Sequence, residues 1–540
     1  MKTINRINIK WQQLFGEIKG LETDVQNRIC IETEVIPIIL VPGLMGSRLR
    51  RRLGKTKIWD PDDTLFMANK YGKSSATAAK RKALLIGSQF RADYAEVHDG
   101  DRRHNKRFTS QHDSNRARRG WGEVMWDSYG EFLVRLQEHQ WSPPLNACFE
   151  FPVHAFGYNW TASNHDAGLA LKRYIDRTTG DYQNGVYSPD GRKRKCNKVI
   201  LVTHSMGGLV ARSACMLHGA EGKVIGVIHG VQPAVGSPSA YWRMKAGFER
   251  PRCGPTREWW DWLRNPLKMA KHHLLGHLSA VVLGTNGEEV TSLLGNSPGG
   301  LELLPTKDYR DNAGNRDWLS YHGAKGEVRL PVADPYEEIY LLRGSAYRMV
   351  DPEWLAPGKL KNVPVGKKGP WQLYSGYLNQ AKKFHNSLQT YFHPESYQFY
   401  GTDLDSPDRV EFSRRDYSHF SRDPFTHVDL RFVNKGGFRT YVDKRDWPLD
   451  MGEEADAIVT LGPPAGKGDG TVPDSSAKVL PFGEERTTKI GTNDGSWFEI
   501  GHQDIFRTSR AQEVVFTCIW NLTQKYIDEQ VVPINAVESR

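Results

Sequence analysis

A serine and two glycines directly follow a run of apolar residues in the stretch VILVTHSMGGLVARSA, residues 199–214. Acyl transfer by a serine requires an oxygen that stands clear of the backbone, a base beside it, and donors for the developing oxyanion. A sharp turn between a buried strand and a helix presents a serine in this way, provided that small neighbours let strand and helix cross closely. The stretch therefore predicts Ser205 as a nucleophile, with Gly207 at the small downstream position.

The upstream small position of this turn is Thr203, which is bulkier than the glycine usual there. An ordinary strand-to-helix connection that happens to contain a serine is the alternative, and the surrounding strand, turn and helix pattern favours the nucleophile. His204 is adjacent to Ser205 in the chain and points elsewhere on such a turn. We therefore assign His204 to packing or a surface contact, and not to the catalytic base.

The acid and the base of a triad are expected after the serine, in that order along the chain. Asp469 lies on the glycine-flanked turn GKGDGTVPDSS (466–476), for which an ordinary Asp-Gly turn is the alternative. His502 lies in the loop of FEIGHQDIF, before the last helical pattern. We predict that Ser205 attacks an ester carbonyl, that His502 transfers the proton, and that Asp469 orients the imidazolium.

Two backbone N–H groups are expected to bind the oxyanion of the intermediate. One belongs to Met206, the residue after the nucleophile, and the other to the loop VPGLMGS (41–47) that follows the first apolar run. Within this loop we expect Leu44 to be the donor, with Gly43 making room. The alternative for the loop is a turn that simply needs glycine.

Apolar runs separated by helical patterns must position these residues. Such runs are typical of strands buried on both faces of a parallel sheet, and their alternation with helices indicates a βαβ architecture. The predicted strands lie within residues 35–43, 146–160, 197–205 and 222–231, with a shorter candidate at 455–462.

Two long stretches interrupt this pattern, a basic one at about 50–120 and one rich in Trp, Tyr, Pro and Gly at about 240–455. Long segments of this kind between core strands typically form caps or lids. The segment 257–278 combines three tryptophans with basic residues. It is either a cap helix packed on the core, which we favour, or an interfacial element at lipid headgroups.

Charge and cysteine content limit the expected partners and cofactors. The 540 residues carry a formal net charge of +10, which attracts anionic surfaces or simply favours solubility. No zinc-finger spacing or RNP-like aromatic signature accompanies the basic runs, so we expect no nucleic-acid partner. The six cysteines are scattered singly, and no acidic cluster has EF-hand spacing. We therefore expect free thiols, no metal and no cofactor.

The N-terminus lacks the continuous apolar segment of a Sec signal peptide, and no window approaches eighteen consecutive apolar residues. We therefore expect synthesis in the cytoplasm and, if the protein is exported, a route that needs no cleavable signal.

Several segments, in this order, resemble lecithin:cholesterol acyltransferase-like and lysosomal phospholipase-like α/β-hydrolases. They are IPIILVPGLMGSRL, FGYNW, THSMGG, SPGGLELLP, GDGTVP and GHQDIF. The resemblance covers the core and not the two insertions, and FGYNW stands where Asp-Trp-Arg is more usual. It implies an α/β-hydrolase fold for residues 34–540, with a mostly parallel central sheet flanked by helices, large cap or lid insertions, and residues 1–33 as an N-terminal extension. It supports Leu44 as an oxyanion donor and Ser205, Asp469 and His502 as the triad.

This core, the missing signal peptide and the basic insertions are together similar to bacterial type VI secretion lipase effectors. That resemblance implies an antibacterial phospholipase delivered to the periplasm of a target cell. It also implies action at a phospholipid membrane surface, a cognate immunity protein, and a spike or tube component as carrier. The leading hypothesis is a serine esterase that cleaves one acyl ester of a phospholipid. The alternatives are a transacylase or neutral-lipid esterase on the same triad, and a binding protein with a catalytically dead hydrolase fold.

Overall fold

The computed structural model describes most of the chain. The described residues are 4–23, 25–71, 77–87, 91, 93–99, 115–188, 191–248, 284–323, 326–357, 368–416, 430–435, 438–443, 457–491 and 501–530. The tryptophan-rich segment 257–278 lies outside them, so its assignment to a cap helix or an interfacial element stays a prediction.

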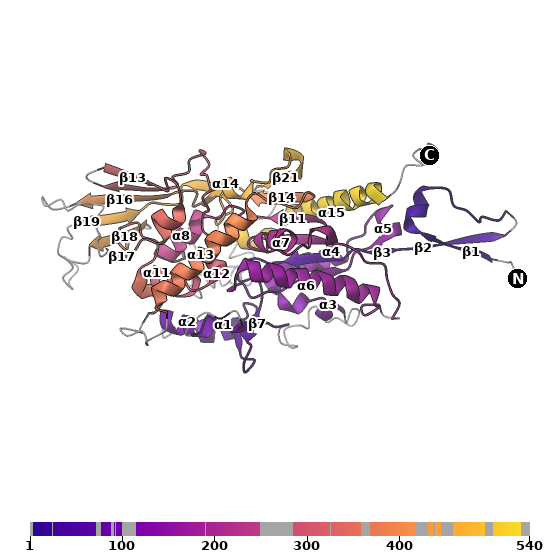
Figure 1. Ribbon diagram of the computed structural model, residues 1–540, viewed down its shortest axis with the longest axis horizontal. Helices are drawn as coiled ribbons and strands as arrows, with labels where there is room; N and C mark the ends of the chain where they lie inside the picture. The colour runs from indigo at the N-terminus through magenta and orange to yellow at the C-terminus, as the bar shows by residue number, and fades with distance from the viewer. Residues whose placement is uncertain are drawn as a thin grey trace, which may run out of the picture.

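A six-stranded sheet lies at the centre of the molecule, in the order β21-β14-β11-β10-β4-β9, and all of its neighbouring strands are parallel (Figure 1). Four of its strands were predicted from apolar runs. They are β4 (Ile38–Val41), β9 (Val153–Ala155), β10 (Val199–His204) and β11 (Val224–Gly230). Every residue of these four strands is buried, as expected for strands covered on both faces. The mostly parallel central sheet is therefore confirmed.

Helices cover both faces of this sheet. Alternate residues of the strands point to opposite sides, so Ile38 packs in one core cluster and Ile39 in the other. The Ile38 cluster includes residues of α4 (Trp126–Gln137) and α15 (Ser509–Gln530). The Ile39 cluster includes residues of α6 (Asn164–Gln183) and α7 (Gly207–Met216). The sheet is thus the middle layer of an α/β/α sandwich.

Two strands of the central sheet lie outside the predicted apolar runs. β14 (Ser396–Gly401) falls within the range of about 240–455 that we had assigned to a cap, and β21 (Thr487–Ile490) is an edge strand. Residues 396–401 therefore belong to the core, which corrects this part of the expected insertion. The sequence SYQFYG contains no aliphatic residue, so it did not match the pattern of a buried strand. Phe399 is fully buried, whereas Tyr397 and Tyr400 are only partly buried.

The predicted strand at 455–462 is β19 (Ala457–Leu461), but it belongs to a second, mostly antiparallel sheet in the order β13-β12-β16-β19-β18-β17. The other strands of this sheet are β12 (Leu319–Gly323), β13 (Gly326–Leu330), β16 (Val410–Asp416), β17 (Leu430–Lys435) and β18 (Phe438–Asp443). Apolar character alone predicted the strand and could not say which sheet it joins. In Figure 1 this sheet lies at the opposite end of the molecule from the N-terminal strands.

Helices of the second insertion lie between the two large sheets in Figure 1. They are α8 (Pro238–Ala246), α11 (Gly287–Leu294), α12 (Pro298–Leu301) and α13 (Pro370–Leu388), with the short helices η5 (Tyr336–Tyr340) and η6 (Pro352–Leu355). The boundaries of the two cap regions otherwise stay predictions.

The N-terminal extension forms a two-stranded parallel sheet that projects from the body (Figure 1). It consists of β1 (Ile4–Lys10) and β2 (Gln26–Glu32), joined through η1 (Trp11–Phe15). The first insertion contributes β5 (Leu49–Arg51), β6 (Lys57–Trp59), α1 (Thr64–Tyr71), α2 (Ala78–Leu85), β7 (Ala95–Val97) and α3 (Asn115–Arg118).

Short elements complete the described chain. They are β3 (Glu34–Val35), η3 (Trp121–Glu123), α5 (Leu145–Cys148), β8 (Phe149–Glu150), η4 (Glu221–Lys223), β15 (Leu404–Ser406), β20 (Gly466–Gly468), α14 (Asp474–Ala477), η8 (Glu484–Arg486) and η9 (His502–Arg507). None of the helices in the described ranges has both the length and the apolar character needed to cross a bilayer. Cys148, Cys196, Cys215 and Cys518 are buried free thiols.

Candidate active site

The nucleophile turn connects β10, which ends at His204, to α7, which begins at Gly207. Ser205 has a φ of +51°, in the left-handed region that non-glycine residues rarely adopt. Backbone hydrogen bonds hold this conformation, because the Ser205 N–H donates to the Gly230 carbonyl at 2.8 Å and its own carbonyl accepts from the Gly208 N–H at 2.9 Å. The turn therefore presents the Ser205 hydroxyl at the carboxyl edge of the central sheet.

Small residues are needed where α7 crosses the strand β4. A Cβ added to Gly207 would lie 2.4 Å from the Val41 carbonyl oxygen, so this position tolerates only glycine. Thr203 is fully buried, and its hydroxyl lies 3.3 Å from Nδ1 of His229 on the neighbouring strand β11. The larger side chain at this position is thus accommodated by a polar contact along the sheet.

Three side chains far apart in the sequence meet at this turn. His502 Nε2 lies 2.8 Å from Ser205 Oγ, and His502 Nδ1 lies 2.6 Å from Asp469 Oδ2. Because the Asp469 carboxylate can only accept, Nδ1 carries the proton of the neutral ring, and Nε2 is left to accept the hydroxyl proton of Ser205. The structure therefore brings Ser205, His502 and Asp469 together in the arrangement of nucleophile, base and acid.

The backbone around Asp469 fixes its carboxylate, which is 1% exposed. Oδ1 accepts the N–H groups of Thr471 at 3.0 Å and Val472 at 2.7 Å, which leaves Oδ2 for His502. The His502 N–H in turn donates to the Asp469 carbonyl at 2.9 Å. A Cβ on Gly401, the last residue of β14, would lie 2.8 Å from Asp469 Cβ. β14, which the apolar pattern did not predict, therefore packs against Asp469.

The loop after β4 approaches the nucleophile closely. A Cβ on Gly43 would lie 3.0 Å from Ser205 Cβ, which is a tight contact, so glycine lets this loop lie close to the nucleophile as the sequence predicted. Leu44 follows, partly buried, and Met45 takes a positive φ of +64°. Met206 is the N-cap residue of α7. Both backbone segments that we expected to supply oxyanion donors therefore flank Ser205.

Comparisons with known proteins identify the fold and the general class of this chain. The profile of the PGAP1-like α/β domain family matches residues 155–243, which include the nucleophile turn. The chain is 26% identical to a chain in the crystal structure of the Tle4–Tli4 complex, over 91% of this chain and 99% of that chain, with a TM-score of 0.64. This chain has the α/β-hydrolase fold. It is a hydrolase of the esterase or lipase type, and the matches confirm its predicted resemblance to α/β-hydrolase lipases and type VI lipase effectors.

The lipase BlEst2 of Bacillus licheniformis, solved in its propeptide form, is 14% identical over 80% of this chain and 70% of that chain. Its TM-score of 0.18 is too low to support an argument. No curated protein matches this chain.

Sequence reasoning assigned no role in the site to two residues behind the triad, Tyr129 and His204. Tyr129 on α4 lies 75 residues before His204, and its hydroxyl is 2.7 Å from His204 Nδ1. Nε2 of His204 lies 3.0 Å from the backbone carbonyl oxygen of His502. Burial, assisted by the neighbouring His502, lowers the pKa of His204 to about 3, so the ring is neutral. The only signal for this contact was the place of His204 next to the nucleophile.

The acidic side chains of the run at 60–63 form ion pairs with Arg48 and Lys57. Among the described residues, no group of three or more His, Cys, Asp or Glu side chains lies close enough to hold a metal ion. Asp60 and Asp62, in the acidic run at 60–63, both pair with the buried Arg48.

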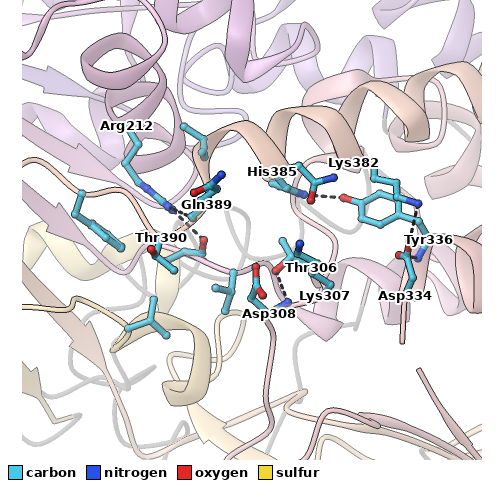
Figure 2. Close-up of a pocket in the computed structure, with 16 residues that line it drawn as sticks. Arg212, Thr306, Lys307, Asp308, Asp334, Tyr336, Lys382, His385, Gln389 and Thr390 are labelled. Atoms are coloured by element: carbon cyan, nitrogen blue, oxygen red, sulfur yellow. Dashed lines mark hydrogen bonds and ion pairs between the residues drawn. The ribbon is translucent and has the colours of Figure 1, made fainter. Parts of the chain in front are cut away.

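A pocket of about 240 Å³ lies beside the C-terminal part of α13, and none of the predicted site residues lines it (Figure 2). The Arg212 guanidinium donates to the Gln389 carbonyl at 3.0 Å, and Lys382 pairs with Asp334 at 2.6 Å. Arg212, Lys382 and Asp334 therefore have partners within the wall of the pocket.

Proposed function

We propose that this chain is a serine phospholipase that hydrolyses an acyl ester of membrane phospholipids. The observation that supports this most directly is the pair of distances that joins Ser205, His502 and Asp469, 2.8 Å and 2.6 Å. The positive φ of Ser205 and its place at the carboxyl edge of the sheet are the conditions under which a serine is an effective nucleophile.

The chemistry follows from this arrangement. Ser205 Oγ attacks the ester carbonyl carbon while His502 Nε2 takes the hydroxyl proton. As the tetrahedral intermediate collapses, the bond to the leaving alcohol breaks and His502 returns the proton to that oxygen. Water then attacks the acyl-enzyme, losing a proton to His502, which passes it to Ser205 Oγ as the fatty acid departs. Asp469 stabilises the imidazolium at both stages.

The oxyanion requires two donors on the same side of the ester. We assign these to the backbone N–H groups of Met206 and Leu44, because both segments lie against Ser205. The N-terminus of α7 adds a favourable electrostatic potential for negative charge at this point.

We also propose the biological setting implied by the resemblance to type VI lipase effectors. In this setting the protein is made in the cytoplasm, is carried by a secretion spike or tube component, and acts on the phospholipid surface of a target cell from its periplasm. The similar Tle4 chain was solved in complex with a second protein, Tli4, which supports a cognate immunity partner for this chain as well. Nucleic acid, metal ions and cofactors have no part in the proposal.

Release of fatty acid from phospholipid vesicles tests the proposed reaction. The purified protein should release fatty acid and react with a fluorophosphonate probe, whereas Ser205→Ala should do neither. Ser213→Ala is a matched control, since Ser213 is a buried serine on α7, the helix that follows the Ser205 turn, and its hydroxyl makes no hydrogen bond within the described structure. It should behave as the unmodified protein. Full activity in Ser205→Ala would refute the proposal.

The same assay separates the alternatives. Acyl transfer to an added alcohol, in place of release of free fatty acid, would identify a transacylase. Absence of probe labelling in the folded, unmodified protein would identify a binding protein on a dead hydrolase fold.

A further inference from the structure

A chain of hydrogen bonds runs behind the triad and joins three separate segments of the site. The Gly43 N–H lies 3.2 Å from the Tyr129 hydroxyl oxygen. The Tyr129 hydroxyl lies 2.7 Å from His204 Nδ1, and His204 Nε2 lies 3.0 Å from the His502 carbonyl oxygen. These hydrogen bonds therefore link the loop that carries Leu44, the end of strand β10 and the loop that carries His502.

The chemistry of the groups fixes the direction of every bond in this chain. A carbonyl oxygen can only accept, so His204 must donate to His502 through an N–H on Nε2. The ring is neutral, because burial lowers its pKa to about 3, and so Nδ1 must accept. The Tyr129 hydroxyl therefore donates to His204 and accepts from Gly43. Each group has one role as donor or acceptor at each contact, and no hydrogen bond can reverse its direction without breaking its neighbour.

The packing leaves this chain little freedom to move. Tyr129 and His204 are at most 1% exposed. A Cβ on Gly46 would lie 2.8 Å from the Tyr129 hydroxyl oxygen, and a Cβ on Gly43 would lie 3.0 Å from His204 Nδ1. The loop that follows β4 thus rests directly on the tyrosine and the histidine, with no side chain between them.

We propose that Tyr129 and His204 are positioning residues, which fix the oxyanion loop and the backbone of His502 relative to Ser205. This inference rests on the proposed function. Misplacement of a catalytic group by about 1 Å costs about 100-fold in rate. Loss of the Tyr129 hydroxyl removes the hydrogen bond to the loop at Gly43 and leaves His204 Nδ1 without its hydrogen-bond donor. The oxyanion loop and His502 are then both less firmly positioned.

The molecule contains a second tyrosine–histidine–carbonyl arrangement that serves as an internal control. The Tyr336 hydroxyl lies 2.6 Å from His385 Nδ1 (Figure 2). His385 Nε2 lies 2.9 Å from the Glu302 carbonyl oxygen. Burial lowers the pKa of His385 to about 4, so this ring is also neutral. The two arrangements have the same chemistry and share no residue, and the second touches none of the triad.

The test compares Tyr129→Phe with Tyr336→Phe, since each removes one hydroxyl from an equivalent pair. Fluorophosphonate titration counts the competent sites, and hydrolysis of a soluble p-nitrophenyl ester is then measured per titrated site. We expect kcat of Tyr129→Phe to fall about 10- to 100-fold with KM changed less than about threefold. We expect Tyr336→Phe to keep the kcat of the unmodified protein, while both variants lose some thermal stability.

Replacing His204 tests the chain from its other end. Glutamine can still accept and donate through its amide, so His204→Gln should retain more activity per titrated site than His204→Met. If the two residues act in series, Tyr129→Phe combined with His204→Met should be little worse than His204→Met alone.

The outcomes separate this inference from the proposed function. An unchanged kcat per titrated site in Tyr129→Phe, an equal fall in Tyr336→Phe, or fully multiplicative effects in the double variant would each overturn the positioning role. Full activity in Ser205→Ala would instead overturn the proposed function itself. Should Tyr129→Phe fail to fold, the comparison of His204→Gln with His204→Met decides, and equal activities of the two would overturn the proposal.

Discussion

At the scale of single residues, backbone strain is concentrated at the carboxyl edge of the central sheet. Ser205 has a φ of +51°, and Val231, at the end of the neighbouring strand, has a φ of +46° although it is β-branched. Both are held by main-chain bonds of the sheet, from the Ser205 N–H to the Gly230 carbonyl and from the Val231 N–H to the Phe399 carbonyl. The parallel sheet thus holds two costly conformations where the chemistry is proposed to occur.

The carboxylate of Asp469 offers a sharp test at this scale. In Asp469→Asn the side-chain amide can donate to His502 Nδ1, which places the ring proton on Nε2 and blocks acceptance from Ser205. We expect kcat for ester hydrolysis to fall about 10³- to 10⁴-fold. Asp405→Asn is the control, since this exposed residue of β15 forms a surface ion pair with Lys467 and should keep full activity. A similar loss in both variants would contradict the assigned role.

The sequence was informative about residues that lie on recognisable turns. Ser205 was identified by its local strand-turn-helix pattern, and Asp469 and His502 by their turns together with their order along the chain. The structure brings all three together. The contact between Tyr129 and His204 was beyond sequence reasoning, because an aromatic residue on an amphipathic helix is indistinguishable from core packing. Long-range hydrogen bonds leave no trace in local spacing.

At the scale of elements, the close crossing of α6 and α7 supports the nucleophile helix. Gly168 of α6 faces α7, and a Cβ there would lie 2.3 Å from Ser213 Oγ and 2.9 Å from the Ala214 amide nitrogen. Gly180, on the same helix, has no atom within 4 Å of such a Cβ. One glycine of α6 is therefore required by packing and the other is not.

Alanine substitutions at the two glycines should have opposite effects on the free energy of unfolding. Gly168→Ala forces α6 and α7 apart and should destabilise the protein by about 1–3 kcal/mol. Gly180→Ala removes a helix-breaking residue from an open position and should stabilise it by about 0.5–1 kcal/mol. Urea denaturation followed by circular dichroism measures both. Destabilisation by Gly180→Ala would show that this helix is not built as described.

Elements buried on both faces were the predictable ones. Four central strands were predicted from apolar runs. β14 and β21 were not recognised, because one carries partly exposed tyrosines and the other is a half-exposed edge strand. Apart from β19, the strands of the second sheet were not recognised for a similar reason, since antiparallel strands in a cap need no continuous apolar run.

At the scale of the whole molecule, a buried carboxyl connects the core to the cap. Glu302 follows α12, and its Oε2 accepts the N–H of Asn164 at the start of α6 at 2.6 Å. Its carbonyl accepts from His385 of α13. Burial is the main reason that the pKa of Glu302 rises from 4.5 to about 8. The folded protein therefore binds a proton here that the unfolded chain releases at lower pH.

This proton makes stability depend on pH with a definite sign. Between about pH 4.5 and pH 8 the Glu302 carboxyl is ionised in the unfolded state and protonated in the folded state. This group therefore lowers the free energy of unfolding as pH rises, by up to about 1.4 kcal/mol per pH unit. Glu302→Gln has no such proton, so its stability relative to the unmodified protein should increase up to about pH 8 and then level off. Urea denaturation across this range measures the difference.

Glu484→Gln, at an exposed glutamate of η8, is the control for this experiment and should show no such trend. A constant difference between Glu302→Gln and the unmodified protein across the range would contradict the predicted linkage.

The buried thiols bear on the change of compartment that delivery would require. Burial raises the pKa of Cys196, Cys215 and Cys518 to about 12, so almost no thiolate is present at neutral pH to start oxidation. Passage from a reducing to an oxidising environment would then neither make nor break a covalent bond at these positions. At these three buried positions, the proposed change of environment would therefore need no redox chaperone.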